Sequence, residues 1–231
     1  MNRLVNLGLA AVAALLVGCG GSGNGLINVP NPRVRFANVL PGIASAKSQV
    51  GQDTISADIP FGTVSDYAIT PNGNKDLTVG DSTFSNLATL SNQLFETNKR
   101  YTGIGYGAAP RAILLLEENE DQAVNNTVAI RAINAFQGSP SLDVYVSAPA
   151  DTLPASPAFD AVAATNITSS VEVSSASGTS YRIRIFADGN TSTALVDKNI
   201  TINTRDRVAL VVYADVGQTS GYNILVLKEN H

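Results

Sequence analysis

The feature that most constrains the fold of this 231-residue chain is an internal duplication. Residues 34–38 (VRFAN) and Gly42 correspond to residues 130–134 (IRAIN) and Gly138 at an offset of 96. Residues 113–119 (ILLLEEN) correspond to residues 224–230 (ILVLKEN) at an offset of 111. Because the order is kept while the offset grows, we interpret the two halves as repeats of one module, with loop insertions in the second repeat.

The hydrophobic pattern of each repeat is typical of β-structure. Residues 142–146 (LDVYV) and 181–185 (YRIRI) alternate apolar and polar side chains, which indicates half-buried strands whose charged residues face away from the core. Residues 207–214 are apolar on both sides and predict a strand that is covered on both faces. Roughly seven short strands in about 100 residues are typical of an immunoglobulin-like sandwich. The predicted fold is therefore all-β, with two tandem immunoglobulin-like β-sandwich domains.

The amino terminus has the pattern of an export signal. Arg3 precedes an apolar run over residues 4–17, and Leu16-Val17-Gly18-Cys19 resembles the lipobox of bacterial lipoproteins. The resemblance implies that residues 1–18 are removed and that Cys19 then carries acyl chains such as palmitate. These chains anchor the protein in a membrane. Gly20 follows Cys19 in place of the Asp that marks inner-membrane retention in that family, which favours the outer membrane of a Gram-negative cell envelope.

These patterns divide the chain into five parts. We expect a signal peptide over 1–18, a flexible tether over 19–32, a first sandwich over 33–119, a linker over 120–127 and a second sandwich over 128–231. The tether is rich in Gly, Ser and Asn. Glu117, Glu118, Glu120 and Asp121 form an acidic run at the boundary, which is either a solvated linker or a set of oxygen ligands for calcium.

Three segments also resemble a known family. Residues 33–38 (RVRFAN), 59–67 (IPFGTVSDY) and 142–146 (LDVYV) are similar to segments of the bacterial envelope family called domain of unknown function 4397. The resemblance implies tandem copies of that domain behind a secretion signal. Since the family has no established activity, it implies no functional residues.

The composition excludes several classes of function. The chain has 15 basic and 19 acidic residues, so it lacks the positive charge that nucleic-acid binding needs. The single histidine is the last residue, His231, and the single cysteine is the expected lipid site, so neither a catalytic triad nor a zinc site can form. We predict no cofactor, no metal and no enzymatic activity. An envelope hydrolase that uses the carboxylates of Asp53 and Asp58 is the less favoured alternative.

A binding role remains. The sequence predicts a lipid-anchored protein that faces the periplasm or the cell surface and acts as a binding or interaction module. Its expected partners are membrane lipid, through Cys19, and an envelope protein or glycan. A carbohydrate-binding module is the main alternative, with Tyr67 and Tyr222 as the expected ligand-binding residues because both adjoin turns.

Overall fold

A computed structural model describes residues 30–175 and 179–230, and all regular structure in these ranges is β. The first half contains β1 (Arg33–Asn38), β2 (Ser45–Val50), β3 (Asp53–Pro60), β4 (Thr63–Val64), β5 (Ala68–Ile69), β6 (Gly73–Gly80), β7 (Asn86–Phe95), β8 (Arg100–Tyr106) and β9 (Ala112–Glu117). The second half contains β10 (Thr127–Asn134), β11 (Leu142–Ser147), β12 (Phe159–Val162), β13 (Val171–Ser174), β14 (Ser180–Ala187), β15 (Val196–Thr201), β16 (Arg207–Ala214) and β17 (Tyr222–Lys228). The expected signal peptide, Cys19 and His231 lie outside the described residues. No helix that could span a membrane occurs in the described ranges.

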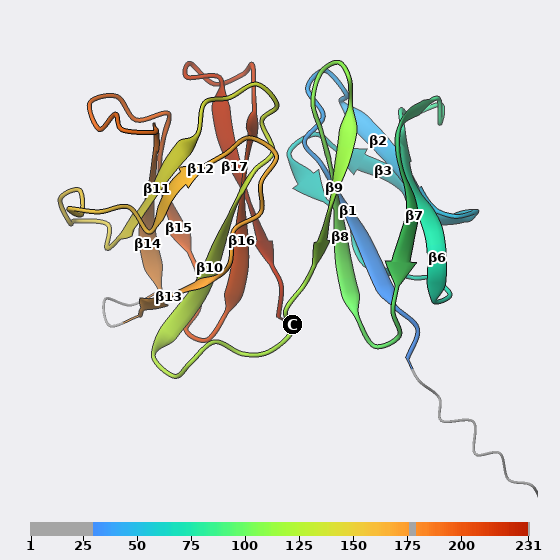
Figure 1. Ribbon diagram of the computed structural model, residues 1–231, viewed down its shortest axis with the longest axis horizontal. Helices are drawn as coiled ribbons and strands as arrows, with labels where there is room; N and C mark the ends of the chain where they lie inside the picture. The colour runs from blue at the N-terminus through green and yellow to red at the C-terminus, as the bar shows by residue number, and fades with distance from the viewer. Residues whose placement is uncertain (1–29, 176–178, 231) are drawn as a thin grey trace, which may run out of the picture.

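Four sheets are stacked as four layers, with two sheets in each half (Figure 1). The first sandwich has an outer sheet of order β3-β2-β6-β7 and an inner sheet of order β4-β1-β8-β9, in which β5 also pairs with β1. The second sandwich has an outer sheet of order β12-β11-β14-β15 and an inner sheet of order β13-β10-β16-β17. Corresponding strands therefore occupy corresponding places, and β1 pairs in parallel with β8 as β10 does with β16.

The predicted all-β sandwich architecture is confirmed. The order of strands within the sheets differs from that of antibody constant domains, where one sheet contains the first, second, fourth and fifth strands. Here the inner sheet contains the first strand together with the last two strands of each sandwich. Each inner sheet therefore contains a parallel pair of strands. β1 and β8 can pair in parallel because the chain between them passes through most of the sandwich, whereas strands joined by a hairpin turn are antiparallel.

Three apolar cores lie between the four layers. The first sandwich encloses one core that includes Phe36 and Leu77, and the second encloses another that includes Leu142 and Ile183. A third core lies between the two inner sheets and includes Ile104 of β8 and Val211 of β16. Both inner sheets are therefore buried on both faces, which confirms the expectation for residues 207–214. The third core joins the two sandwiches into one packed unit.

The two ends of the molecule differ in what they present. The described chain begins at Pro30, whose carbonyl accepts the N–H of Asn98 at 2.7 Å, and it ends at Asn230, close to Arg205. We call this the terminal end, and Figure 1 shows both chain ends there. The loops that follow β1, β8, β10 and β16 lie at the opposite end, which we call the distal end.

One expectation about the strands was wrong. The charged side chains of 142–146 and 181–185 were expected to face solvent, but Asp143 and Arg184 are only 4% and 6% exposed. Arg184 donates from Nη2 to Ser147 Oγ at 2.9 Å and to the carbonyl of Thr152 at 2.8 Å. The loop between β11 and β12 therefore covers this part of the outer face, a long-range contact that the alternation of a strand does not reveal.

Candidate functional site

A buried charged cluster lies between the inner sheets near the terminal end. Arg35 on β1 donates from Nε to Thr102 Oγ1 at 2.8 Å and to Glu118 Oε1 at 3.0 Å. It also donates from Nη2 to the carbonyl of Lys228 in the second sandwich at 2.6 Å. Both Arg35 and Glu118 are 5% exposed. Burial raises the pKa of the Glu118 carboxyl, although the charge of Arg35 and the hydroxyl of Thr102 act in the opposite direction.

The second repeat contains the equivalent pair. Arg131 donates from Nε to Glu229 Oε1 at 2.7 Å, and from Nη2 to the other carboxylate oxygen. The carboxylate of Glu229 in turn accepts the backbone N–H of Asn119 at 3.0 Å. Together with the contact from Arg35 to Lys228, this hydrogen bond connects the two pairs across the interface between the sandwiches. The cluster therefore fixes how the sandwiches sit against each other.

Tyr67 belongs to this cluster. Its hydroxyl donates to Glu118, and the guanidinium carbons of Arg35 and Arg100 lie 4.6 Å and 5.4 Å from its ring centroid. Burial raises the pKa of Tyr67, and the hydrogen bond to Glu118 adds to the effect. A hollow of about 400 Å³ adjoins the ring, but the two arginines already contact the ring itself.

Tyr222 lies far from Tyr67. It begins β17 at the distal end, where its ring packs 4.8 Å from that of Phe136 and against the core of the second sandwich. Burial raises the pKa of Tyr222. The two tyrosines thus lie on different sandwiches and at opposite ends of the molecule, so they cannot stack on one sugar ligand.

The carboxylates named as a hydrolase pair stand apart. Asp53 begins β3, and Asp58 lies near the end of the same strand. The two residues are five positions apart, which separates them by about 16 Å along an extended strand. Glycosidases need a separation of about 5 to 9.5 Å. Asp53 accepts a hydrogen bond from Thr70 at 3.2 Å, and Asp58 accepts one from Ser45. Their placement does not support glycoside hydrolysis by this pair.

The acidic run that begins at the last residue of β9 is largely neutralised by bases of the first sandwich. Glu117 pairs with Lys99 at 2.6 Å, and Glu120 pairs with Arg100 at 3.2 Å. Glu118 pairs with Arg35, as described above. These partners give the run a structural role, so three of its carboxylates are already engaged without a calcium ion.

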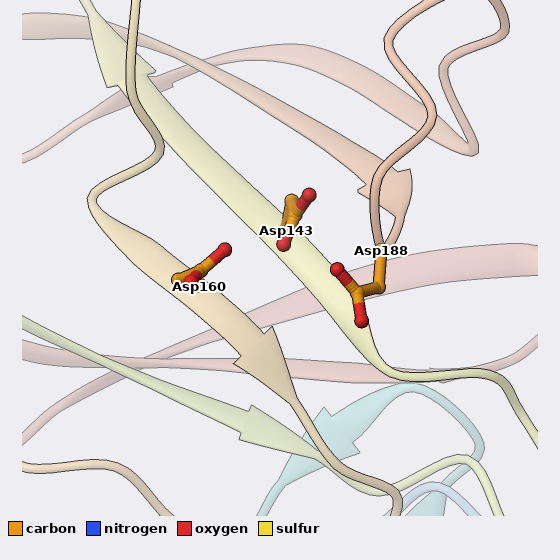
Figure 2. A group of neighbouring side chains, drawn as sticks. All are labelled: Asp143, Asp160 and Asp188. Atoms are coloured by element: carbon orange, nitrogen blue, oxygen red, sulfur yellow. The ribbon is translucent and has the colours of Figure 1, made fainter.

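A different group of carboxylates comes together on the second sandwich. Figure 2 shows Asp143 of β11, Asp160 of β12 and Asp188 after β14, whose carboxylate oxygens lie within 4.8 Å of one another. Such oxygens are ligands that a hard cation prefers. Asp143 already accepts the N–H groups of Ala161 at 2.9 Å and Gly189 at 3.1 Å. The sequence did not reveal this group, because its members come from two strands and the turn after a third, which only the tertiary structure brings together.

The distal end carries an apolar groove that both sandwiches form. It has a volume of about 490 Å³ and is lined by Pro41, Gly42, Ile43, Ala44, Pro60, Phe61, Ala214, Asp215 and Val216, which we call the distal groove. Val216 is 92% exposed. Asp215 is the only charged residue of this lining, and hydrogen bonds from Asn223 and from the N–H of Gly217 hold its pKa below the ordinary value. A smaller hollow of about 200 Å³ continues the groove past Pro41 and Val216 to Phe136.

The fold and these sites define an all-β protein made of two packed β-sandwiches. The family model described as Domain of unknown function (DUF4397) matches residues 32–145, so this part of the chain carries a DUF4397-like domain. The match covers the first sandwich and ends inside β11. That the second sandwich is another copy of the same domain stays a prediction.

Comparisons beyond this family are distant. No curated protein sequence matches the chain. One similar structure is the product complex of SpuA, a multi-modular glycogen-degrading pneumococcal virulence factor, with 6% identity and a TM-score of 0.28; the match covers 78% of this chain and 20% of that one. Another is a family 26 carbohydrate-binding module of Eubacterium rectale Amy13K in complex with maltoheptaose, with 10% identity and a TM-score of 0.26; the match covers 84% of this chain and 95% of that one. This chain spans about a fifth of the length of the first structure, and likeness at these TM-scores carries no conclusion about a ligand.

Proposed function

We propose that this protein is a non-catalytic binding protein of the bacterial cell envelope, anchored in the outer membrane through lipid on Cys19. Its ligand is an apolar segment of a partner protein, which binds in the distal groove. The observation that carries the proposal is the position of this groove, which both sandwiches form at the end opposite Pro30. A lipid attached before Pro30 would leave the groove facing away from the membrane.

The chemistry of the groove favours a protein segment over a glycan. Sugar sites combine an aromatic face with several polar partners. The distal groove instead offers Ile43, Phe61, Val216 and two prolines, with a single carboxylate at Asp215. Because Asp215 stays ionised, the segment that fits best is apolar and contains one basic residue.

The roles of the acidic side chains support binding over catalysis. Glu118 and Glu229 are held in ion pairs, and Asp143 accepts two backbone hydrogen bonds. A general acid or base must instead reach a substrate proton. Turnover of an envelope substrate that is lost when a single Asp or Ser is replaced would contradict this part of the proposal.

The anchor is tested separately from the groove. Cells that express the full chain and are fed an alkyne fatty acid should yield labelled protein in the outer-membrane fraction. Cys19→Ser should abolish the label, whereas the neighbouring Gly23→Ser should not. Unlabelled protein that still begins with Met1 in the envelope would overturn the anchoring part.

The groove is tested with a displayed library of random peptides. Peptides selected on the protein should be apolar with a basic residue, and Val216→Asp should weaken their binding about tenfold or more. Ile69→Asp is the matched control, because Ile69 is 66% exposed but lies at the terminal end, beside Arg33. Equal loss in both variants, or no selection, would contradict the groove. A glycan-array signal lost on Tyr67→Ala or Tyr222→Ala would favour the carbohydrate alternative.

A further inference from the structure

The two sandwiches contact each other through equivalent surfaces. On β1 and β8, Ala37 lies opposite Ile104, and on β10 and β16 the equivalent pair is Ile133 and Val211. Both pairs lie in the third core. A contact between like surfaces of two like units has an approximate two-fold axis. Because β1 and β10 both run towards the distal end, this axis runs along the molecule, and each feature of the distal end has an equivalent across it (Figure 1).

The distal groove lies on one side of this axis. Its larger apolar side chains come from the loop after β1 (Pro41 and Ile43), the turn after β3 (Phe61) and the loop after β16 (Val216). Ile43 and Phe61 are half-buried, and Val216 is 92% exposed. Two loops of the first sandwich and one loop of the second therefore form the groove.

Backbone hydrogen bonds identify the equivalent residues across the axis. The N–H groups of Ile43 and Ser139 each donate to the carbonyl three residues earlier, both at 3.1 Å. The N–H groups of Gly62 and Thr165 each donate to the carbonyl of the asparagine that ends the first strand of their sandwich, at 2.8 Å and 2.7 Å. Counted from these bonds and from the registers of β8 and β16, the equivalents are Gln137 for Pro41, Ser139 for Ile43, Ala164 for Phe61 and Ala109 for Val216.

The equivalent place is polar or small where the distal groove is apolar. Glutamine stands for proline, serine for isoleucine, and alanine for both phenylalanine and valine. The second sandwich nevertheless has the same arrangement of inner strands as the first. The fold therefore does not require the larger apolar side chains of the distal groove, and an exposed apolar surface of this kind is typical of a binding site. Its presence on one side only predicts one bound ligand per molecule.

The hollow that continues the groove lies on the axis itself. Its volume is about 200 Å³. Two equivalent pairs line it, Pro41 with Gln137 and Gly107 with Ala214, together with Ala108 and Phe136. We call it the axial hollow.

Small residues leave the axial hollow open. Ala135, which also lines it, occupies the position that Val39 holds in the first sandwich, and Gly107 has no side chain. The ring of Phe136 is held in place by Tyr222, with the ring centroids 4.8 Å apart. Of the described residues that line the hollow, none is charged. A neutral apolar side chain is therefore the group that fits, because a buried polar group without a partner is costly.

The axial hollow and the distal groove are continuous. Pro41, Ala214 and Val216 line both. The hollow has roughly the volume of seven water molecules, which is room for one large side chain but not for a further length of chain. A segment that lies in the groove and passes Val216 therefore reaches the hollow with a single side chain.

We propose that the axial hollow is the specificity subsite of the distal groove and takes one Leu, Met or Phe side chain of the bound segment. This inference rests on the binding function proposed above, and it names a residue that the ligand must contain in addition to its basic residue. Burial of such a side chain favours binding, and a segment that lacks it occupies the groove alone. Because the hollow lies on the axis, it is filled once per molecule.

The test compares peptides selected from a displayed random library on the native full-length protein and on Ala108→Phe. Ala108 lines the hollow and is itself exposed, so the new ring fills the hollow without displacing the core. Peptides selected on the native protein should share a Leu, Met or Phe at a fixed spacing from the basic residue. Replacing that residue of the peptide with Ala should weaken binding about tenfold or more. On Ala108→Phe, the Ala-substituted peptide should bind at least as well as its parent.

Two further variants control this comparison. Thr191→Phe adds the same ring to an exposed loop outside the hollow, and it should select the same peptides as the native protein. Ala108→Leu is a smaller insertion that replaces Ala108→Phe if circular dichroism shows the latter to be unfolded. Titration calorimetry should give one peptide per molecule.

The possible failures are distinguishable. The subsite is overturned by selected peptides without a fixed large apolar residue, by two peptides per molecule, or by equal weakening of the parent and the Ala-substituted peptide in Ala108→Phe. The groove itself survives these results if Val216→Asp still weakens binding. Unchanged binding to Val216→Asp, or no selection on the native protein, would contradict the groove and the subsite together.

Discussion

Phe36 on β1 lies opposite Gly103 on the parallel strand β8, and its ring occupies the space where a side chain at position 103 would lie. A Cβ atom at Gly103 would meet Phe36 Cδ2 at 2.8 Å and Leu77 Cδ2 at 2.6 Å. In the second core the equivalent pair is Ala132 and Leu210, in the same register. In the first sandwich the large residue of the pair lies on the first strand, and in the second sandwich it lies on the strand that pairs with the first one. In both sandwiches the pair combines one large and one small residue, which fills the core.

This exchange predicts that the pair can be swapped. Gly103→Leu alone should lower the free energy of unfolding by about 2 kcal/mol or more, because the core has no room for the side chain. Phe36→Ala alone should cost about 3 to 5 kcal/mol. The double variant, which copies the second core, should recover at least half of the summed loss in urea denaturation. Simple addition of the two losses would show that the positions do not share one space.

The Arg35 and Glu118 pair predicts a strong asymmetry between single and double changes. Arg35→Met leaves the carboxylate of Glu118 buried without its base, and should lower the free energy of unfolding by about 3 to 5 kcal/mol. Adding Glu118→Gln should restore at least half of this, since the neutral amide still accepts from Thr102 and Tyr67. Urea midpoints measure both effects. A double variant as unstable as Arg35→Met would show that the loss comes from the contact between Arg35 and Lys228 instead.

The raised pKa of Glu118 predicts a specific dependence on pH. A carboxyl whose pKa is higher in the folded than in the unfolded protein binds its proton more tightly when folded. Its contribution to stability is therefore fully present below the unfolded pKa, about 4.3, and is lost as the pH rises through the folded pKa. The stability of the native protein relative to Glu118→Gln should fall as the pH is raised from about 4.

The comparison with Glu118→Gln is needed because other groups act in the opposite sense. Hydrogen bonds lower the pKa values of Asp81, Asp197 and Asp215, so these groups stabilise the fold at higher pH and lose that contribution as the pH falls. Both proteins contain them, and the difference between the two pH profiles isolates position 118. A difference that increases with pH would contradict the assigned direction.

Asn38 and Asn134 should be equivalent in their energetic role. Both are fully buried at the ends of β1 and β10. Asn38 donates to the carbonyls of Ile43 at 3.1 Å and Ile59 at 2.9 Å, and Asn134 donates to the carbonyl of Val162 at 3.1 Å. Asn38 thus joins the end of β1 to the loop that follows it and to β3, and Asn134 joins the end of β10 to the end of β12.

Replacing either asparagine with Ala should leave buried carbonyls without donors. We expect each of Asn38→Ala and Asn134→Ala to lower the free energy of unfolding by about 2 kcal/mol in urea denaturation. Asn72→Ala is the control, because Asn72 is exposed in a turn and should change stability by less than about 0.5 kcal/mol. A large effect at only one of the two buried positions would contradict their equivalence.

Much of the architecture could be predicted from local patterns. The alternation in 181–185 and the apolar run in 207–214 predicted strands that became β14 and β16, because side-chain period and burial are linked along a single strand. The repeat predicted that Arg35 and Arg131 are equivalent, and both now pair with a glutamate. The candidate sites could not be predicted in the same way. The prediction of Tyr67 and Tyr222 as binding residues rests on their position beside turns, and a turn carries no information on which distant strands lie beside it.

The sequence by itself determined the all-β composition of the fold and the order in which strands occur, because these depend on neighbours along the chain. Only the tertiary structure decided that the two inner sheets pack through Ile104 and Val211 into a third core. That packing buried the Arg35 cluster and formed the distal groove. The physical reason is that a residue is buried by segments that lie far away along the chain. A sheet with two apolar faces does not specify which other sheet will cover its second face.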